Sequence, residues 1–123
     1  MAQLAPINLN MFRGDTPSWN LAITTDGAAR NISTDSLRMT AKYSTDDADN
    51  AAVFSKTVGG GITVTNGAGG LATVLLAKSD TNTLPGQTVT LFYDIELTTS
   101  GNSVFTIAWG TLTIQPDVSI TTP

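Results

Sequence analysis

Asp94 and Glu96 are the residues of this sequence whose types and spacing come nearest to catalytic machinery. Alternate residues of a β-strand project from the same face, so both carboxylates would share one face. A carboxylate pair is what a glycosidase uses, one group as general acid and the other as base or nucleophile. The favoured interpretation is that the two side chains solubilise the outward face of a long strand. We therefore expect no catalytic residue.

Most other catalytic and metal sites need residue types that are missing here. The sequence has no His and no Cys, which excludes Ser-His-Asp and Cys-His catalysis and thiolate or two-histidine metal sites. The loop of Asp46, Asp47, Asp49 and Asn50 offers oxygen ligands for calcium. The EF-hand pattern fails there, because no Gly follows at the turn position and no Glu closes the loop. A solvated loop is favoured, and we expect no metal and no cofactor.

Two motifs with functional associations are interpreted as turns. Arg13-Gly14-Asp15 is the cell-adhesion tripeptide, but it lies between two expected strands. There Gly14 would take an unusual backbone angle and Asp15 would cap the turn. The glycine clusters at 59–61 and 67–70 resemble phosphate loops only in glycine content, because neither precedes Lys-Ser or Lys-Thr or opens a helix. We expect simple bends.

The aromatic residues support two interpretations. Three of them alternate with aliphatic neighbours, which is typical of core aromatics: Trp19, Tyr93 and Trp109. Together with Phe92 and Phe105 they could instead form a platform on which sugar rings stack. Phe92 differs from the others because it falls on the Thr, Asp and Glu face of its strand. An exposed Phe beside Asp94 indicates a protein interface, so we predict both residues there.

Short strands are the elements that would carry these residues, because apolar residues alternate between turn residues and no window has a helical period. The expected strands lie near 7–11, 19–23, 37–43, 52–57, 62–64, 71–77, 89–97 and 105–114. This pattern predicts an all-β fold, an immunoglobulin-like antiparallel β-sandwich of seven to eight strands. A small barrel is the alternative.

The alternation also predicts the core and one irregularity. The residues expected to be buried are Trp19, Leu21, Leu37, Met39, Tyr43, Leu91, Tyr93, Ile95, Ile107 and Trp109. After Gly110 the apolar residues change parity, since Leu112 and Ile114 fall on the other set of alternate positions. One extra residue in a strand produces such a change, so we predict a β-bulge at Gly110.

Composition limits the class of protein. A chain of 123 residues has the usual size of one domain. Its polar residues are mostly Thr, Ser, Asn, Asp and Gly, and Glu96 is its one Glu, which favours strands over helices. A net charge of −4 with scattered Lys and Arg argues against nucleic-acid binding. No membrane span or secretory signal is recognisable, so we expect synthesis in the cytoplasm of the producing cell.

Four segments together resemble a known family. They are Phe12-Arg13-Gly14-Asp15-Thr16, Ile23-Thr24-Thr25-Asp26-Gly27, Ser79-Asp80-Thr81 with Leu84-Pro85-Gly86, and Phe92-Tyr93-Asp94-Ile95-Glu96-Leu97 followed by Gly110-Thr111-Leu112. In this order they resemble the immunoglobulin-like domain at the N-terminus of baseplate upper proteins of tailed bacteriophages, and related small phage virion proteins. The resemblance covers about residues 7–120. It implies that Asp80 caps local amides, Leu84 fills the end of the sandwich, and Pro85-Gly86 turns into the long strand.

The resemblance implies a non-enzymatic virion structural protein that acts through protein contacts. Baseplate proteins continue into further domains, whereas this sequence ends, so a capsid decoration or a tail or baseplate adaptor is expected. The expected partners are further copies of the chain, as a trimer or symmetric array, and other virion proteins, but no nucleic acid and no membrane. The expected location is the virion, after synthesis in the host cytoplasm. The alternative is a carbohydrate- or surface-binding β-sandwich module.

Contacts between copies are expected at strand edges and at both ends of a single domain that spans residues 1–123. An extended arm at 1–6 and a tail at 119–123 can add themselves to exposed sheet edges. Besides Phe92 and Asp94, the predicted interface residues are therefore Leu4, Pro6 and Ile120.

Overall fold

The structure is a computed structural model that describes residues 6–117. Ten strands make up almost all of its regular structure, with two three-residue 3-10 helices, η1 (Asp49–Ala51) and η2 (Lys78–Asp80). The strands are β1 (Leu9–Phe12), β2 (Ser18–Ala22), β3 (Thr24–Thr25), β4 (Ala28–Ala29), β5 (Ser36–Lys42), β6 (Phe54–Val58), β7 (Gly61–Asn66), β8 (Leu71–Leu75), β9 (Val89–Thr98) and β10 (Val104–Gln115). The all-β prediction is confirmed.

Eight of the strands form one sheet in the order β1-β10-β9-β5-β6-β7-β8-β2, and β3 and β4 form a small hairpin. The sheet is mixed, so the prediction of an antiparallel arrangement throughout was wrong. β1 runs parallel to β10 and β6 runs parallel to β7, while the other pairs are antiparallel. Alternation of apolar residues reports which face a side chain occupies but not the direction of the neighbouring strand, so it did not reveal these pairs.

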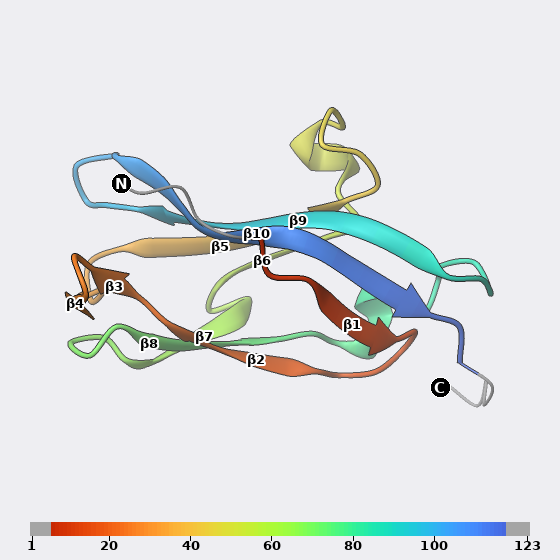
Figure 1. Ribbon diagram of the computed structural model, residues 1–123, viewed down its shortest axis with the longest axis horizontal. Coiled ribbons are helices and arrows are strands. Elements are labelled where there is room, and N and C mark those ends of the chain that lie inside the picture. Colours follow the sequence, from red (N-terminus) through yellow and green to blue (C-terminus); the bar gives the residue numbers. More distant parts are fainter. Residues whose placement is uncertain (1–5, 118–123) are drawn as a thin grey trace.

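The large sheet curls back on itself. Figure 1 shows β5, β9 and β10 as an upper layer over β2, β7 and β8. Every second residue of β9 is buried, from Val89 to Leu97, and these side chains face the core between the layers. β10 contributes Ala108, Leu112 and Ile114 from the same side. Burial of these alternating side chains is the main stabilising contribution to the fold.

Half of the predicted core is confirmed. Leu37, Met39, Leu91, Tyr93 and Ile95 are buried. Three further predicted residues are only partly buried and pack against the core: Trp19, Leu21 and Ile107.

Tyr43 and Trp109 were wrongly predicted to be buried, since they are 49% and 40% exposed. Tyr43 has the right parity for the core, but β5 ends at Lys42 and the chain has already left the sheet. Trp109 lies on the outer face because a β-bulge in β10 precedes it, between Thr106 and Ala108.

The predicted irregularity in the last strand exists, but not at Gly110. The register between β9 and β10 shifts between Thr106 and Ala108, so Ile107 is the extra residue. From Ala108 to Ile114 the ladder is regular, with Trp109 opposite Asp94 and Gly110 opposite Tyr93. A bulge three residues earlier than predicted turns Trp109 outward and leaves Leu112 inside.

Gly110 is required for a different reason. The backbone of Ile7 crosses it so closely that a Cβ at Gly110 would collide with the Ile7 carbonyl. The Ile7 amide donates to the Trp109 carbonyl oxygen at 2.8 Å, and the Tyr93 hydroxyl donates to the Ile7 carbonyl oxygen at 2.6 Å. These contacts hold the segment before β1 against β10.

The Arg13-Gly14-Asp15 motif is part of the scaffold. The Arg13 guanidinium donates to Asp117 at 2.7 Å and to the Leu84 carbonyl oxygen at 2.9 Å. Gly14 has φ 81°, as expected for a turn glycine, and its amide donates to the buried Thr81 hydroxyl. Because the Arg13 side chain is mostly buried in these contacts, it is unsuited to recognition by an adhesion receptor.

Local contacts of Asp80 and burial of Leu84 hold the segment between β8 and β9 in place. The Asp80 carboxylate accepts from the Ala77 amide at 2.7 Å and pairs with Lys56 at 2.6 Å. Leu84 is buried at the core.

Candidate functional site

A groove of about 800 Å³ lies on the outer face of β5, β9 and β10. This volume falls in the range of about 300–1,000 Å³ that is usual for small-molecule sites. The side chains beneath it point away from the core, because they occupy the alternate positions of strands whose other residues are buried.

The strand register arranges nine side chains of this face in three rows. One row crosses the sheet as Arg38, Glu96 and Thr106, the next as Thr40, Asp94 and Trp109, and the third as Lys42, Phe92 and Thr111. All nine line the groove. Rigid neighbouring strands therefore fix the relative positions of two aromatic rings, two carboxylates, two cations and three hydroxyls.

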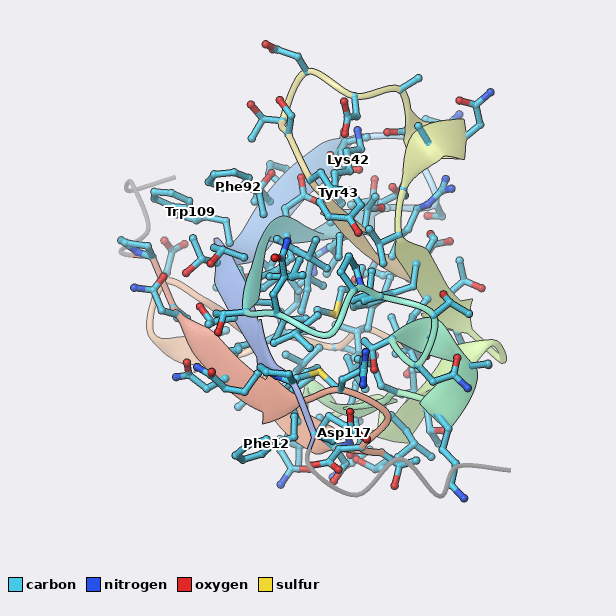
Figure 2. All side chains as sticks on the ribbon, turned by 90° about the vertical axis from the view of Figure 1, so that its right-hand side faces the viewer. Phe12, Lys42, Tyr43, Phe92, Trp109 and Asp117 are labelled. Carbon is cyan, nitrogen blue, oxygen red and sulfur yellow. The ribbon has the colours of Figure 1, made fainter. Side chains whose placement is uncertain are left out.

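Phe92 and Trp109 form the aromatic part of the site. They are diagonal neighbours on β9 and β10, since Phe92 pairs with Thr111 and Trp109 pairs with Asp94. At this diagonal spacing large aromatic side chains can reach one another. Figure 2 shows the two rings side by side at the surface, where Phe92 is 43% and Trp109 40% exposed.

Asp94 and Glu96 supply the acidic part. Both side chains are half-buried on the groove side of β9. Partial burial, together with the neighbouring charge of Glu96, raises the pKa of the Asp94 carboxyl above its ordinary value. The ion pairs among residues 6–117 include neither carboxylate. Both therefore keep acceptor capacity for a ligand.

The cations at the groove are held differently from each other. The Lys42 ammonium donates to the Asp47 carbonyl oxygen at 2.8 Å and pairs with Asp49 at 2.7 Å. This contact with Lys42 lowers the pKa of the Asp49 carboxyl. Arg38 is exposed, and its Nε donates to the Ser55 hydroxyl at 3.2 Å.

The acidic loop of residues 46–50 is tied to the groove by these contacts. The Asp47 carboxylate accepts from the Ser44 amide, and Asp49 pairs with Lys42. Across residues 6–117, no group of three or more His, Cys, Asp or Glu side chains is arranged to hold a metal ion. The loop thus forms one wall of the groove and positions Lys42.

The segment before β1 forms another wall. Pro6 and Asn8 both line the groove. The Asn8 side-chain oxygen accepts from the amide and the hydroxyl of Thr111, at 3.2 Å and 3.1 Å. Tyr93 supports this wall from the core side through its bond to Ile7, and burial raises the pKa of its phenol.

Three of the five predicted interface residues meet in this one groove: Pro6, Phe92 and Asp94. Leu4 and Ile120 lie outside the described residues. Sequence reasoning missed Lys42 and Arg38 as members of the site, and it named Trp109 only in the alternative of a sugar-stacking platform. Trp109 was assigned to the core, whereas Arg38 and Lys42 were recognised only as soluble residues of a half-buried strand. Only the register of β5 against β9 places Arg38 and Lys42 beside the residues of β9, and the alternation of apolar residues does not reveal that register.

No family model matches the chain, and no curated protein matches it either. Within residues 6–117 there is no helix long and apolar enough to span a membrane.

Proposed function

We propose that the protein is a non-enzymatic structural component of a bacteriophage particle, either a capsid decoration protein or a tail or baseplate adaptor. It joins copies of itself, as a trimer or symmetric array, and other virion proteins. The proposal draws on the resemblance of four segments to phage baseplate domains and on the absence of His and Cys from the sequence. In this proposal the curled sheet is a variant of the immunoglobulin-like sandwich.

The observation that carries the proposal is the composition of the outer face of the lower layer. β2, β7 and β8 contain no charged residue. Their outward side chains include the cross-strand row Thr63, Thr73 and Asn20, flanked by Leu71 and Leu75, which are 41% and 52% exposed. The central areas of protein interfaces are depleted in charge, and hydroxyl and amide groups there can pair with those of a partner.

The edges of the sheet support the same role. β1 and β2 are the end strands of the large sheet, and each is paired on one side only among the described residues. An unpaired edge presents backbone donors and acceptors to an added strand. The arm at 1–6 and the tail at 119–123 are the segments that we propose to supply this strand to a neighbouring copy.

Charge introduced on the uncharged face tests the proposal. The double substitution Leu71→Lys and Leu75→Lys would place two ammonium groups where the partner packs, so assembly should weaken at least tenfold. The matched control is Val104→Lys, because Val104 is 55% exposed at the start of β10, outside this face. Light scattering over a concentration series and co-sedimentation with phage heads and tails measure the effect.

The controls define the result that would overturn the proposal. The unaltered chain should associate with itself or with a phage component, and the Val104→Lys chain should behave in the same way. A monomer at every concentration that also binds no phage component would contradict the structural role. Equal loss in the control and in the double variant would show that the lower face is not the contact surface.

A further inference from the structure

We propose that the groove on β5, β9 and β10 binds an uncharged oligosaccharide of flat, gluco-configured pyranose rings. Among the described residues, Pro6 of the arm is the one that this groove shares with the surfaces assigned to virion contacts, and the inference does not depend on the proposed function. It assigns Phe92 and Asp94 to a sugar site and not to the protein interface predicted for them.

The aromatic pair provides the apolar contact. In gluco-configured rings the hydroxyl groups are equatorial and the axial C–H bonds form an apolar face. Such a face packs on an aromatic ring, which offers large contact area at a low cost in side-chain entropy. Phe92 and Trp109 lie side by side (Figure 2), so two successive rings of one chain can each find an aromatic partner.

The polar groups beside the rings suit hydroxyl groups. Each sugar hydroxyl both donates and accepts a hydrogen bond, so it needs acceptors and donors within reach. Asp94 and Glu96 accept, while Arg38 and Lys42 donate, and both kinds of group lie in rows next to the aromatic residues. Hydroxyls of Thr40, Thr106 and Thr111 can do either. Bonds to charged groups are also stronger than bonds between neutral groups.

Charge distinguishes this ligand from the competing classes. A protein partner would have to cover five ionised side chains of the groove. Lys42 and Asp49 already pair with each other, but the partner would have to pair Arg38, Asp94 and Glu96, which protein interface centres generally avoid. Two cations against three carboxylates leave no excess of positive charge for an acidic polysaccharide or a phosphate. A neutral molecule with many hydroxyls meets neither obstacle.

The site is also preorganised. Its central nine side chains stand on three adjacent strands, and Lys42 is already held by Asp47 and Asp49. The Pro6 and Asn8 wall is fixed by the bonds from Asn8 to Thr111 and from Tyr93 to Ile7. Little ordering entropy is lost on binding to such a surface, which favours affinity.

Calorimetry with defined oligosaccharides tests the proposal on the full chain. The probes are cellotetraose and tetra-N-acetylchitotetraose, with oligogalacturonate as the acidic control. We expect saturable binding of at least one of the two uncharged probes and none of the acidic one. Intrinsic fluorescence should change with the same affinity, since Trp109 lies in the groove.

Variants locate the site. Trp109→Ala and Phe92→Ala should each weaken binding about tenfold, and Asp94→Asn should weaken it severalfold. Phe12→Ala is the matched control, because Phe12 is 55% exposed on β1 and lies outside the groove. This variant should bind the oligosaccharide with unchanged affinity. Circular dichroism and thermal melting of each variant establish that it remains folded.

Several outcomes would overturn the inference. One is the absence of binding by both uncharged probes at millimolar concentration in a folded, unaltered chain. Another is binding that survives both aromatic substitutions. A third is a phage protein whose capture is lost with Trp109→Ala, which would make the groove a protein interface. Assembly would be unaffected in the first two cases, so failure here differs from failure of the structural role.

Discussion

The two outer faces of the curled sheet differ in chemistry although the same alternation builds both. On β5, β9 and β10 the outward positions carry Arg38, Lys42, Asp94 and Glu96 together with two exposed aromatic rings. On β2, β7 and β8 they carry Thr, Asn, Ser, Ala and Leu, and no charge. A face that only had to remain soluble would need neither the aromatic pair nor the complete lack of charge.

The difference suggests a division of labour. The upper face is hollowed and has rigidly placed polar groups, which suits a small ligand. The lower face is uncharged and ends at the edge strand β2, which suits a protein surface. Substitutions that affect one face without the other are therefore the sharpest tests of the comparison.

Gly110→Ala should have the largest effect. The added Cβ would meet the Ile7 backbone and would sit at φ 155°, so the segment before β1 must move away from β10. We expect a loss of about 3 kcal/mol in the free energy of unfolding, measured by chemical denaturation. The groove should lose its Pro6 and Asn8 wall, whereas the lower face should be unaffected.

Gly101→Ala is the control for this prediction. The Cβ of an alanine at position 101 would lie 3.8 Å from the nearest atom, the Thr99 hydroxyl oxygen, which is an ordinary van der Waals contact. This substitution should change stability by less than about 0.5 kcal/mol. If Gly110→Ala and Gly101→Ala lowered the free energy of unfolding equally, the close approach of Ile7 would not restrict the residue at position 110.

Tyr93→Phe should have an intermediate effect. The variant keeps the buried ring but loses the 2.6 Å hydrogen bond to the Ile7 carbonyl oxygen. We expect destabilisation by about 1 kcal/mol. Hydrogen exchange should also show faster exchange of the Ile7 amide, with no change in the amides of β2 and β8. Unchanged exchange at Ile7 would mean that Tyr93 does not anchor the wall of the groove.

Asp94→Asn should have the smallest effect on stability, and its sign depends on pH. Burial raises the pKa of the folded-state carboxyl above 3.8, so the folded protein loses stability as pH rises through that pKa. The variant lacks this loss, and at pH 7 it should be more stable than the unaltered chain by at most about 0.5 kcal/mol. Below pH 3.8 the gain should vanish.

Asp49→Asn provides the opposite sign. Lys42 lowers the pKa of Asp49 in the folded protein, so the ionised carboxylate stabilises the fold above its ordinary pKa of 3.8. Removing it should destabilise the protein at pH 7 and have no effect in acid. Thermal melting of both variants between pH 3 and pH 7 makes the comparison. If both substitutions changed the stability at pH 7 in the same direction, the environments assigned to Asp94 and Asp49 would be wrong.

The sequence by itself determined the all-β class of the fold and half of the residues that it predicted for the core. Alternation in residues 37–43 and 89–97 depends only on the two-residue period of a strand, so Leu37, Met39, Leu91, Tyr93 and Ile95 were placed correctly. It also identified Phe92 as an outward aromatic residue. The odd position of Phe92 among polar neighbours is a local property of one strand.

Tertiary structure alone decided which outward residues meet. The bulge at Ile107 fixes whether Trp109 faces the core or the solvent, and a parity change read from sequence allows several positions for it. The register of β5 against β9 brings Arg38 and Lys42 to Asp94 and Phe92. Likewise, Gly110 is needed because Ile7, 103 positions earlier in the sequence, crosses it. Contacts between distant strands have no local sequence period, and for that physical reason the groove emerged only with the fold.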